Sequence, residues 1–228
     1  MNNFLMVLAG CLLAVLGALF AVPPLIDWNR YRGVFEEEVS RFVGREVRVG
    51  GNVQLRLLPV PYVGFEKVRI ADAPGIPGPF VSAERFTLWL AIPPLLRGVL
   101  EARKIEIEQP TARVRFNEQG GGNWQSVAFS DARLPFVPRQ IALQSVHLVG
   151  GRVVIENAAG VEIAVINGLA GELSAPELAG PYRFTGQAGT GDASYELRVS
   201  TAKATVDGMV RLKAVLRSLK SPASAAID

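Results

Sequence analysis

The feature that most constrains this chain is a stretch from Gly44 to Trp124 in which apolar and polar residues alternate in short runs, with prolines and glycines between the runs. Successive side chains of a strand face opposite sides of a sheet, so this alternation predicts short antiparallel strands joined by tight connections. The run at 80–92 is the clearest case, and Pro93-Pro94 ends it because proline cannot donate to a strand ladder. The sequence therefore predicts a mainly β fold in which the sheet has one apolar face.

The N-terminal segment, residues 1–26, contains no charged side chain. As a helix it would be about 39 Å long, more than the roughly 30 Å hydrocarbon core of a bilayer. We interpret it as an uncleaved transmembrane anchor. A cleavable signal peptide is the alternative, and it fits less well because the run is long and lacks a clean cleavage site. Apolar residues continue past the lone cysteine, Cys11, so a lipidation site is not expected there.

Residues 27–44 are predicted to form a short amphipathic helix, with apolar residues three or four positions apart. Asp27 is a suitable N-cap and Gly44 a suitable C-terminal stop. Trp28 and Tyr31 are expected at the membrane interface, where aromatic side chains anchor spans. The helix would either lie on the membrane at the mouth of a groove or pack on the end of the sheet.

The rest of the chain is expected to contain two repeated β units and a tail. The predicted segments are 45–133 for the first unit, 134–217 for the second, a proline-containing linker at 134–139 where the second begins, and 218–228 for a tail or truncated end. The motif Ile105-x-Ile107 with Pro110 is echoed by Val146-x-Leu148 with Gly151, a period of roughly 40 residues that is typical of stacked repeats.

Many short motifs keep a characteristic order and spacing in the first half of the chain. They are Gly44-Arg45, Val47, Val49, Gly51, Val53, Leu55, Pro59, Phe65, Val68, Ile70, Pro94-Leu95-Leu96, Gly98, Ile105, Ile107, Pro110 and Asn123-Trp124. Together they resemble the N-terminal part of the AsmA family of Gram-negative envelope proteins. That family resembles bridge-like lipid-transfer proteins, in which repeated antiparallel β units form a curved sheet or groove with an apolar interior.

The resemblance implies a single-pass inner-membrane protein with the bulk of the chain in the periplasm. It also implies binding or transfer of membrane lipids, phospholipid in particular, in support of outer-membrane biogenesis. Charge alone gives the opposite orientation, because Arg30 and Arg32 follow the span while the N-terminal tail has no Lys or Arg. We follow the resemblance on this point.

An amphipathic sheet must cover its apolar face, either with a second layer of protein or by curving around a ligand. The alternating residues fit a closed β-sandwich core and an open lipid groove equally well, and the resemblance favours the groove. The residues expected to line it are Leu55, Leu57, Phe86, Leu88, Leu90, Ile105, Ile107, Val114, Phe116, Val153, Ile155, Leu197 and Val199.

No sequence motif points to catalysis, a cofactor or a metal. His147 is the only histidine and lies in an alternating strand, while phosphate-binding loops and serine nucleophile elbows are missing from the sequence. The net charge is only +3 with both signs interspersed, so we expect no nucleic-acid partner. We expect a non-enzymatic protein. The alternative to lipid transfer is a membrane-tethered scaffold that modulates outer-membrane protein assembly through strand edges, with envelope assembly proteins as partners.

Overall fold

The computed structural model describes residues 2–95, 102–118, 121–126, 143–175, 181–190, 193–202, 211–218 and 224–227. The helices are α1 (Asn2–Ala21), η1 (Pro23–Leu25), η2 (Trp28–Tyr31), α2 (Arg32–Val43), α3 (Ile92–Leu95) and η3 (Asn123–Ser126). The strands are β1 (Val47–Val49), β2 (Val53–Arg56), β3 (Tyr62–Ala71), β4 (Pro79–Leu90), β5 (Ala102–Glu108), β6 (Thr111–Arg115), β7 (Leu143–Glu156), β8 (Glu162–Ala175), β9 (Arg183–Thr190), β10 (Ala193–Thr201), β11 (Leu212–Ser218) and β12 (Ser224–Ile227). The mainly β fold is confirmed, since all twelve strands belong to one sheet.

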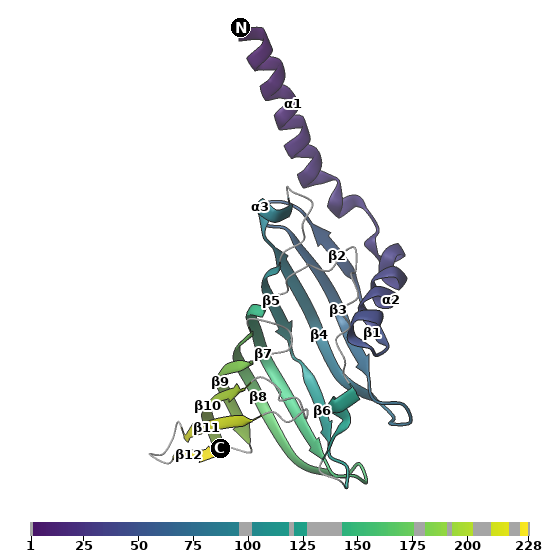
Figure 1. The fold of residues 1–228 in the computed structure, drawn as a ribbon. Helices are drawn as coiled ribbons and strands as arrows, with labels where there is room; N and C mark the ends of the chain where they lie inside the picture. Colours follow the sequence, from purple (N-terminus) through teal and green to yellow (C-terminus); the bar gives the residue numbers. More distant parts are fainter. Residues whose placement is uncertain are drawn as a thin grey trace.

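Helix α1 projects away from the sheet (Figure 1). Its segment Phe4–Ala21 has 18 residues, a mean hydropathy of 2.6 and no buried residue. The helix is therefore long and apolar enough to cross a membrane, and it is compatible with a single-pass anchor.

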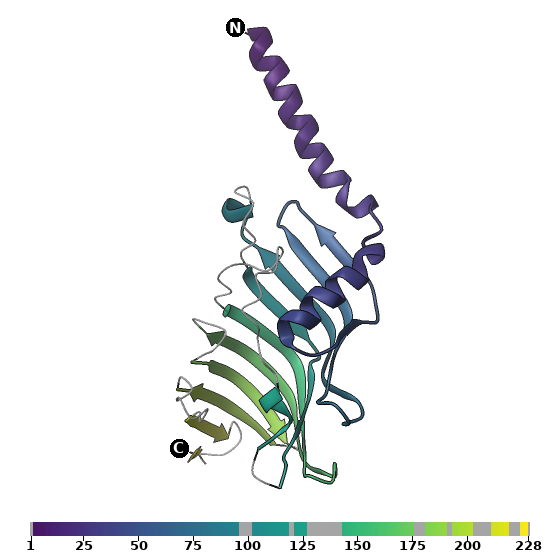
Figure 2. The same cartoon turned by 45° about the vertical axis from the view of Figure 1, so that its right-hand side comes forward.

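The predicted amphipathic helix is divided into a 3-10 turn, η2, and the helix α2. Asp27 caps the turn, because its Oδ1 accepts a hydrogen bond of 3.1 Å from the Asn29 N–H. Gly44 ends α2 with a left-handed φ of 73°, which glycine adopts without strain. Helix α2 packs over the β1–β3 edge of the sheet (Figure 2). There the Phe35 and Phe65 rings meet edge to face at 5.5 Å.

The strand order is β1-β3-β4-β5-β7-β8-β9-β10-β11-β12, with β2 also pairing with β3 and β6 with β4 and β7. The sheet is curved rather than flat (Figure 1). Its pairing is antiparallel with one exception that the sequence did not predict: β7 runs parallel to β5 and to β6. Strands β5 and β6 are two parts of one path, since both pair with β4 on one side and with β7 on the other.

This parallel pairing places the two copies of the predicted repeat side by side. Ile105 pairs with Val146, and Ile107 with Leu148. Each copy ends in the same turn: the Asn117 side chain accepts a hydrogen bond from the Gly121 N–H (2.7 Å), and that of Asn157 from the Val161 N–H (2.9 Å). The two copies of the motif are therefore neighbours in the sheet and share this hydrogen bond, while the division into two β units stays a prediction.

Three further expectations concern the ends of elements. The run predicted at 80–92 ends at Leu90, and the prolines after it lie in the short helix α3. Within the segment 218–228, which was expected to be a tail or truncated end, Ser224–Ile227 forms a strand paired with β11. The linker predicted at 134–139 lies outside the described residues.

Candidate functional site

Two rows of apolar residues cross ten strands of the sheet, from β2 to β12, each residue directly opposite the next. The first apolar row is Leu55, Val63, Leu88, Ile105, Val146, Leu173, Phe184, Val199, Ala214 and Ile227. The second apolar row is Val53, Phe65, Phe86, Ile107, Leu148, Gly171, Gly186, Leu197, Leu216 and Ala225. Paired residues share a face, and so do residues two apart along a strand, so from β2 to β11 both rows lie on the same face.

From β2 to β11, the residues between these rows point to the opposite face and are mostly polar. This polar row is Gln54, Gly64, Thr87, Glu106, His147, Glu172, Thr185, Arg198, Val215 and Ala226. The lone histidine is thus a member of the polar row, and its Nε2 lies 2.7 Å from the Ser145 hydroxyl. From β2 to β10 the sheet is therefore amphipathic, with one apolar face and one mainly polar face, while the polar row reaches an apolar residue at Val215 in β11.

The structure brings seven of the thirteen expected lining residues together in the two apolar rows. They are Leu55, Phe86, Leu88, Ile105, Ile107, Leu197 and Val199. Their shared facing across strands follows from the pairing register, which the sequence does not contain. Their role in lining a groove stays a prediction.

The other six expected residues lie outside these rows. Leu57 follows β2 and is half-buried, while Leu90 is buried at the end of β4. Val114 pairs with Ile155, and Val153 lies on the same strand as Ile155, beyond an interruption of the sheet described below. Phe116 is 40% exposed, and its ring packs edge-on to Trp124 at 5.2 Å.

Several members of the apolar rows were missed at the sequence level. For Val63, Phe65, Val146 and Leu148, the alternation was visible and would have been a sufficient signal. Strand β9 gave a weaker signal because its apolar side is carried by Phe184 and two small residues. The facing glycines Gly171 and Gly186 fill the second apolar row where the backbones approach closely, and the end of the Phe184 ring lies over both.

An interruption of the sheet, which we call the crease, lies beyond the second apolar row along the strands. It consists of Lys67 in β3, Gln109 between β5 and β6, and Gly150 in β7. All three have left-handed backbones, with φ values of 53°, 48° and 67°. Glu66, Arg85, Glu108 and Val149 pair with one another in this order across four neighbouring strands. The three crease residues come directly after Glu66, Glu108 and Val149. Lys67 and Gln109 carry side chains in a conformation that favours glycine, so the crease holds backbone strain beside the second apolar row.

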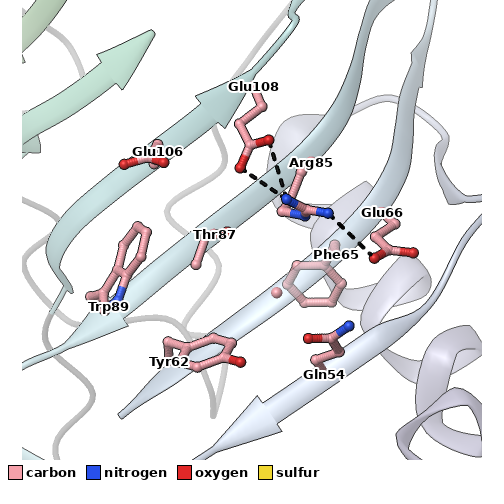
Figure 3. A pocket seen from close by; sticks show the side chains of 10 residues that line it. Gln54, Tyr62, Phe65, Glu66, Arg85, Thr87, Trp89, Glu106 and Glu108 are labelled. Atoms are coloured by element: carbon pink, nitrogen blue, oxygen red, sulfur yellow. Dashed lines mark hydrogen bonds and ion pairs between the residues drawn. The ribbon is translucent and has the colours of Figure 1, made fainter. Parts of the chain in front are cut away.

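Figure 3 shows a cavity of about 260 Å³ on the polar face. It is lined by Gln54, Tyr62, Gly64, Phe65, Glu66, Arg85, Thr87, Trp89, Glu106 and Glu108. Its charged groups pair with one another or with a neighbour: Arg85 lies 3.2 Å from Glu108 and 3.8 Å from Glu66, and Glu106 lies 2.6 Å from Lys104. Apart from Phe65 of the second apolar row, the lining residues belong to the polar face, so the cavity lies opposite the apolar rows.

Comparison with known protein families identifies the chain. The model of the AsmA family matches residues 3–217, nearly the whole length. This chain belongs to the AsmA family. The comparisons with curated proteins and with solved structures gave no match.

The structure explains two motifs on which the resemblance to the AsmA family rests, Gly44-Arg45 and Asn123-Trp124. Arg45 and Asn123 meet in one buried polar cluster with Asp72: the Arg45 guanidinium lies 3.6 Å from the Asp72 carboxylate, which also accepts a 2.8 Å hydrogen bond from the Asn123 amide. Arg45 also donates to the Asn123 carbonyl, and Asn123 bonds the backbone of β6 at Arg113 and Arg115. In this AsmA-family chain the two motifs therefore tie the end of α2, β3 and β6 together.

Proposed function

We propose that this AsmA-family protein binds or transfers membrane lipids on the apolar face of its sheet, and through that supports outer-membrane biogenesis. In this proposal α1 anchors the chain in the inner membrane, the sheet lies in the periplasm, and the protein is not an enzyme. The observation that carries the proposal is the pair of apolar rows, which keep one chemical character over ten strands. Family membership supports the envelope setting.

The length of the rows suits an acyl chain. Ten strands about 4.8 Å apart make each row roughly 40 Å long when measured along the sheet. One leaflet contributes about half of the roughly 30 Å hydrocarbon core, so a row is longer than one extended acyl chain in a bilayer. Lipid can therefore stay in contact with apolar side chains over its whole length.

The expected driving force is non-specific burial of hydrocarbon. Moving one methylene from water to an apolar surface gains about 0.8 kcal/mol, so twelve methylenes gain close to 10 kcal/mol before the cost of ordering the lipid is subtracted. Such an interaction needs no headgroup site. It would hold phospholipids of several headgroup types, and we expect membrane phospholipid as the cargo.

The proposal is tested by mass spectrometry of the lipid extract from residues 27–228, exported to the periplasm and purified with minimal detergent. We expect phospholipid to co-purify in near-stoichiometric amounts. A folded, lipid-free domain would contradict the proposal and direct attention to the scaffold function, in which protein partners bind the sheet edges.

Matched substitutions on the two faces sharpen this test. Leu88→Asp and Leu197→Asp place a charge in the apolar rows, while Thr185→Asp places the same charge in the polar row. We expect the first two to lose lipid with the circular dichroism of the folded sheet retained, and Thr185→Asp to keep it. If Leu88→Asp and Leu197→Asp unfold the domain instead, the rows form a closed core, because a lone buried charge is costly.

A further inference from the structure

A row of cationic and aromatic side chains crosses four strands at one end of the polar face, at the last register level of β2 and β3 and just before the final pair of β4 and β5, Leu90 with Ala102. Arg56 pairs with Tyr62, Tyr62 with Trp89, and Trp89 with Lys104. The side chains touch in sequence: the Arg56 guanidinium lies 5.9 Å from the Tyr62 ring centroid, the two rings are 6.4 Å apart, and the Lys104 ammonium lies 4.9 Å from the Trp89 ring. We call these four residues the interfacial row.

Beyond the interfacial row, the connections at the strand ends expose apolar side chains to solvent. Val60, between β2 and β3, and Ile92, just after β4, are each 43% exposed. The two connections are held together, because the Leu90 N–H donates a 2.9 Å hydrogen bond to the Pro61 carbonyl. Exposure alone does not distinguish these two residues, since Val161 and Ile163 are 57% and 61% exposed; their position beside the interfacial row and near α1 does.

The segment that follows α1 adds to this surface. Leu25 in η1 is 82% exposed, and η1 contacts β2. The Asn29 side chain accepts a 3.0 Å hydrogen bond from the Val53 N–H, which fixes the turn η2 to the start of the same strand. In Figures 1 and 2 the end of β2 and the helix α3 lie at the end of the sheet that is nearest to α1.

We infer that this end of the sheet docks onto the membrane in which α1 is anchored. Leu25, Val60 and Ile92 enter the boundary between headgroups and acyl chains, and the interfacial row lies at headgroup depth. This order matches the depth preferences of the residue types, since Trp and Tyr collect at the membrane interface and Arg and Lys extend to its polar side. Arg56 and Lys104 are attracted to anionic phospholipid.

The inference rests on the membrane-anchored function proposed above and adds a place where lipid meets the sheet. Leu55 and Leu88 in the first apolar row are one residue away from Arg56 and Trp89 of the interfacial row. Docking would therefore bring the first apolar row to within one register level of the membrane surface. A lipid leaving the bilayer would reach apolar side chains without crossing a wide aqueous gap.

The test uses the full chain with Cys11→Ser, reconstituted in nanodiscs of phosphatidylethanolamine and phosphatidylglycerol with brominated acyl chains. A fluorescent bimane label is placed at Val60→Cys or Ile92→Cys. The control is Ile163→Cys, which is 61% exposed and therefore at least as accessible. Ile163 lies at the far end of the sheet, because β7 runs parallel to β5, away from the interfacial row, before it turns into β8.

We expect the labels at Val60 and Ile92 to lose fluorescence in brominated nanodiscs while the label at Ile163 keeps it. Equal, weak quenching at all three positions would overturn the inference. A second measurement isolates the cations: Arg56→Gln with Lys104→Gln should reduce quenching at Val60 in nanodiscs that contain phosphatidylglycerol. If quenching at Val60 stays the same in this double variant, Arg56 and Lys104 do not belong to the docking surface.

The two proposals fail separately in these experiments. If the labels at Val60 and Ile92 are quenched but no lipid binds the apolar rows, the docking inference holds and the lipid-transfer proposal is wrong. If lipid binds the apolar rows but the labels at Val60 and Ile92 are not quenched, the docking inference is wrong and the lipid-binding proposal holds.

Discussion

Arg45 and Asp72 are oppositely charged side chains that are 4% and 3% exposed, and Asn123 bonds both. A buried charge is tolerated only when it is paired and hydrogen-bonded, so each member of this cluster depends on the others. The cluster contains no reactive arrangement and ties three segments together. The motifs Gly44-Arg45 and Asn123-Trp124 were recognisable in the sequence. The contact between them was not, because Arg45 and Asn123 are 78 residues apart.

Removing one member of this cluster should destabilise the fold strongly. Asp72→Ala leaves the Arg45 guanidinium buried without its carboxylate, and we expect it to lower the free energy of unfolding by about 3–5 kcal/mol. The control is Glu108→Ala, which breaks a solvent-exposed pair with Arg85 and should cost less than about 1 kcal/mol. Urea unfolding followed by circular dichroism measures both. Equal effects would show that the cluster is not a buried structural unit.

At Gly186 the neighbouring backbone leaves no room for a side chain. A Cβ there would lie 2.2 Å from the Ala170 carbonyl oxygen, whereas a Cβ at Gly64 would have only ordinary contacts of 3.7 Å or more. We expect Gly186→Ala to lower stability by about 1–3 kcal/mol, as overpacking does. Gly64→Ala is the control and should be close to neutral. Thermal unfolding of the two variants compares them, and equal melting temperatures would contradict the close approach of β8 and β9.

At the scale of elements, the crease divides strand paths that the sequence shows as simple runs. Gln109 has a left-handed φ of 48°, a conformation that costs a side-chain-bearing residue about 1–2 kcal/mol. Glycine removes this cost but adds roughly 0.5–1 kcal/mol of chain entropy. Gln109→Gly should therefore be neutral or stabilising by up to about 1.5 kcal/mol.

The opposite substitution in the same crease should destabilise. Gly150→Ala places a side chain at a φ of 67°, and we expect a loss of about 1–2 kcal/mol although the site has space for a methyl group. Denaturant midpoints of the Gln109→Gly and Gly150→Ala variants should move in opposite directions, or only the second should move. A marked loss of stability in Gln109→Gly would argue against the left-handed backbone at this position.

The alternation of residues predicted much of this element-level structure. It gave the facing of Phe86 and Leu88 in β4 and of Ile105 in β5, because a strand reverses its side chains at every residue. It did not give the parallel pairing of β5 with β7, since parallel and antiparallel neighbours can have the same hydrophobic period. The four members of the interfacial row also escaped prediction, because they come from four strands and meet only through register.

At the scale of the whole molecule, the register turns separate amphipathic strands into one amphipathic sheet. The two apolar rows extend from β2 to β12 without a charged member. Helix α2 packs on this face at the β1–β3 end, through the contact of Phe35 with Phe65. The interfacial row lies at the end of the sheet that is nearest to α1, so an apolar helix compatible with a membrane anchor and the apolar rows belong to one body.

The most direct test of the central claim is site-specific photo-crosslinking of the full chain in native membranes. Benzoylphenylalanine would replace Ile107, Leu148 or Leu197 in the second apolar row, and Glu106 or Thr185 in the polar row. These sites lie within the sheet and away from α1, so lipid around the anchor does not contribute. We predict phospholipid adducts at the three apolar positions and none at the two polar ones. Adducts at neither set, or equally at both, in a folded protein would contradict a lipid-binding apolar face.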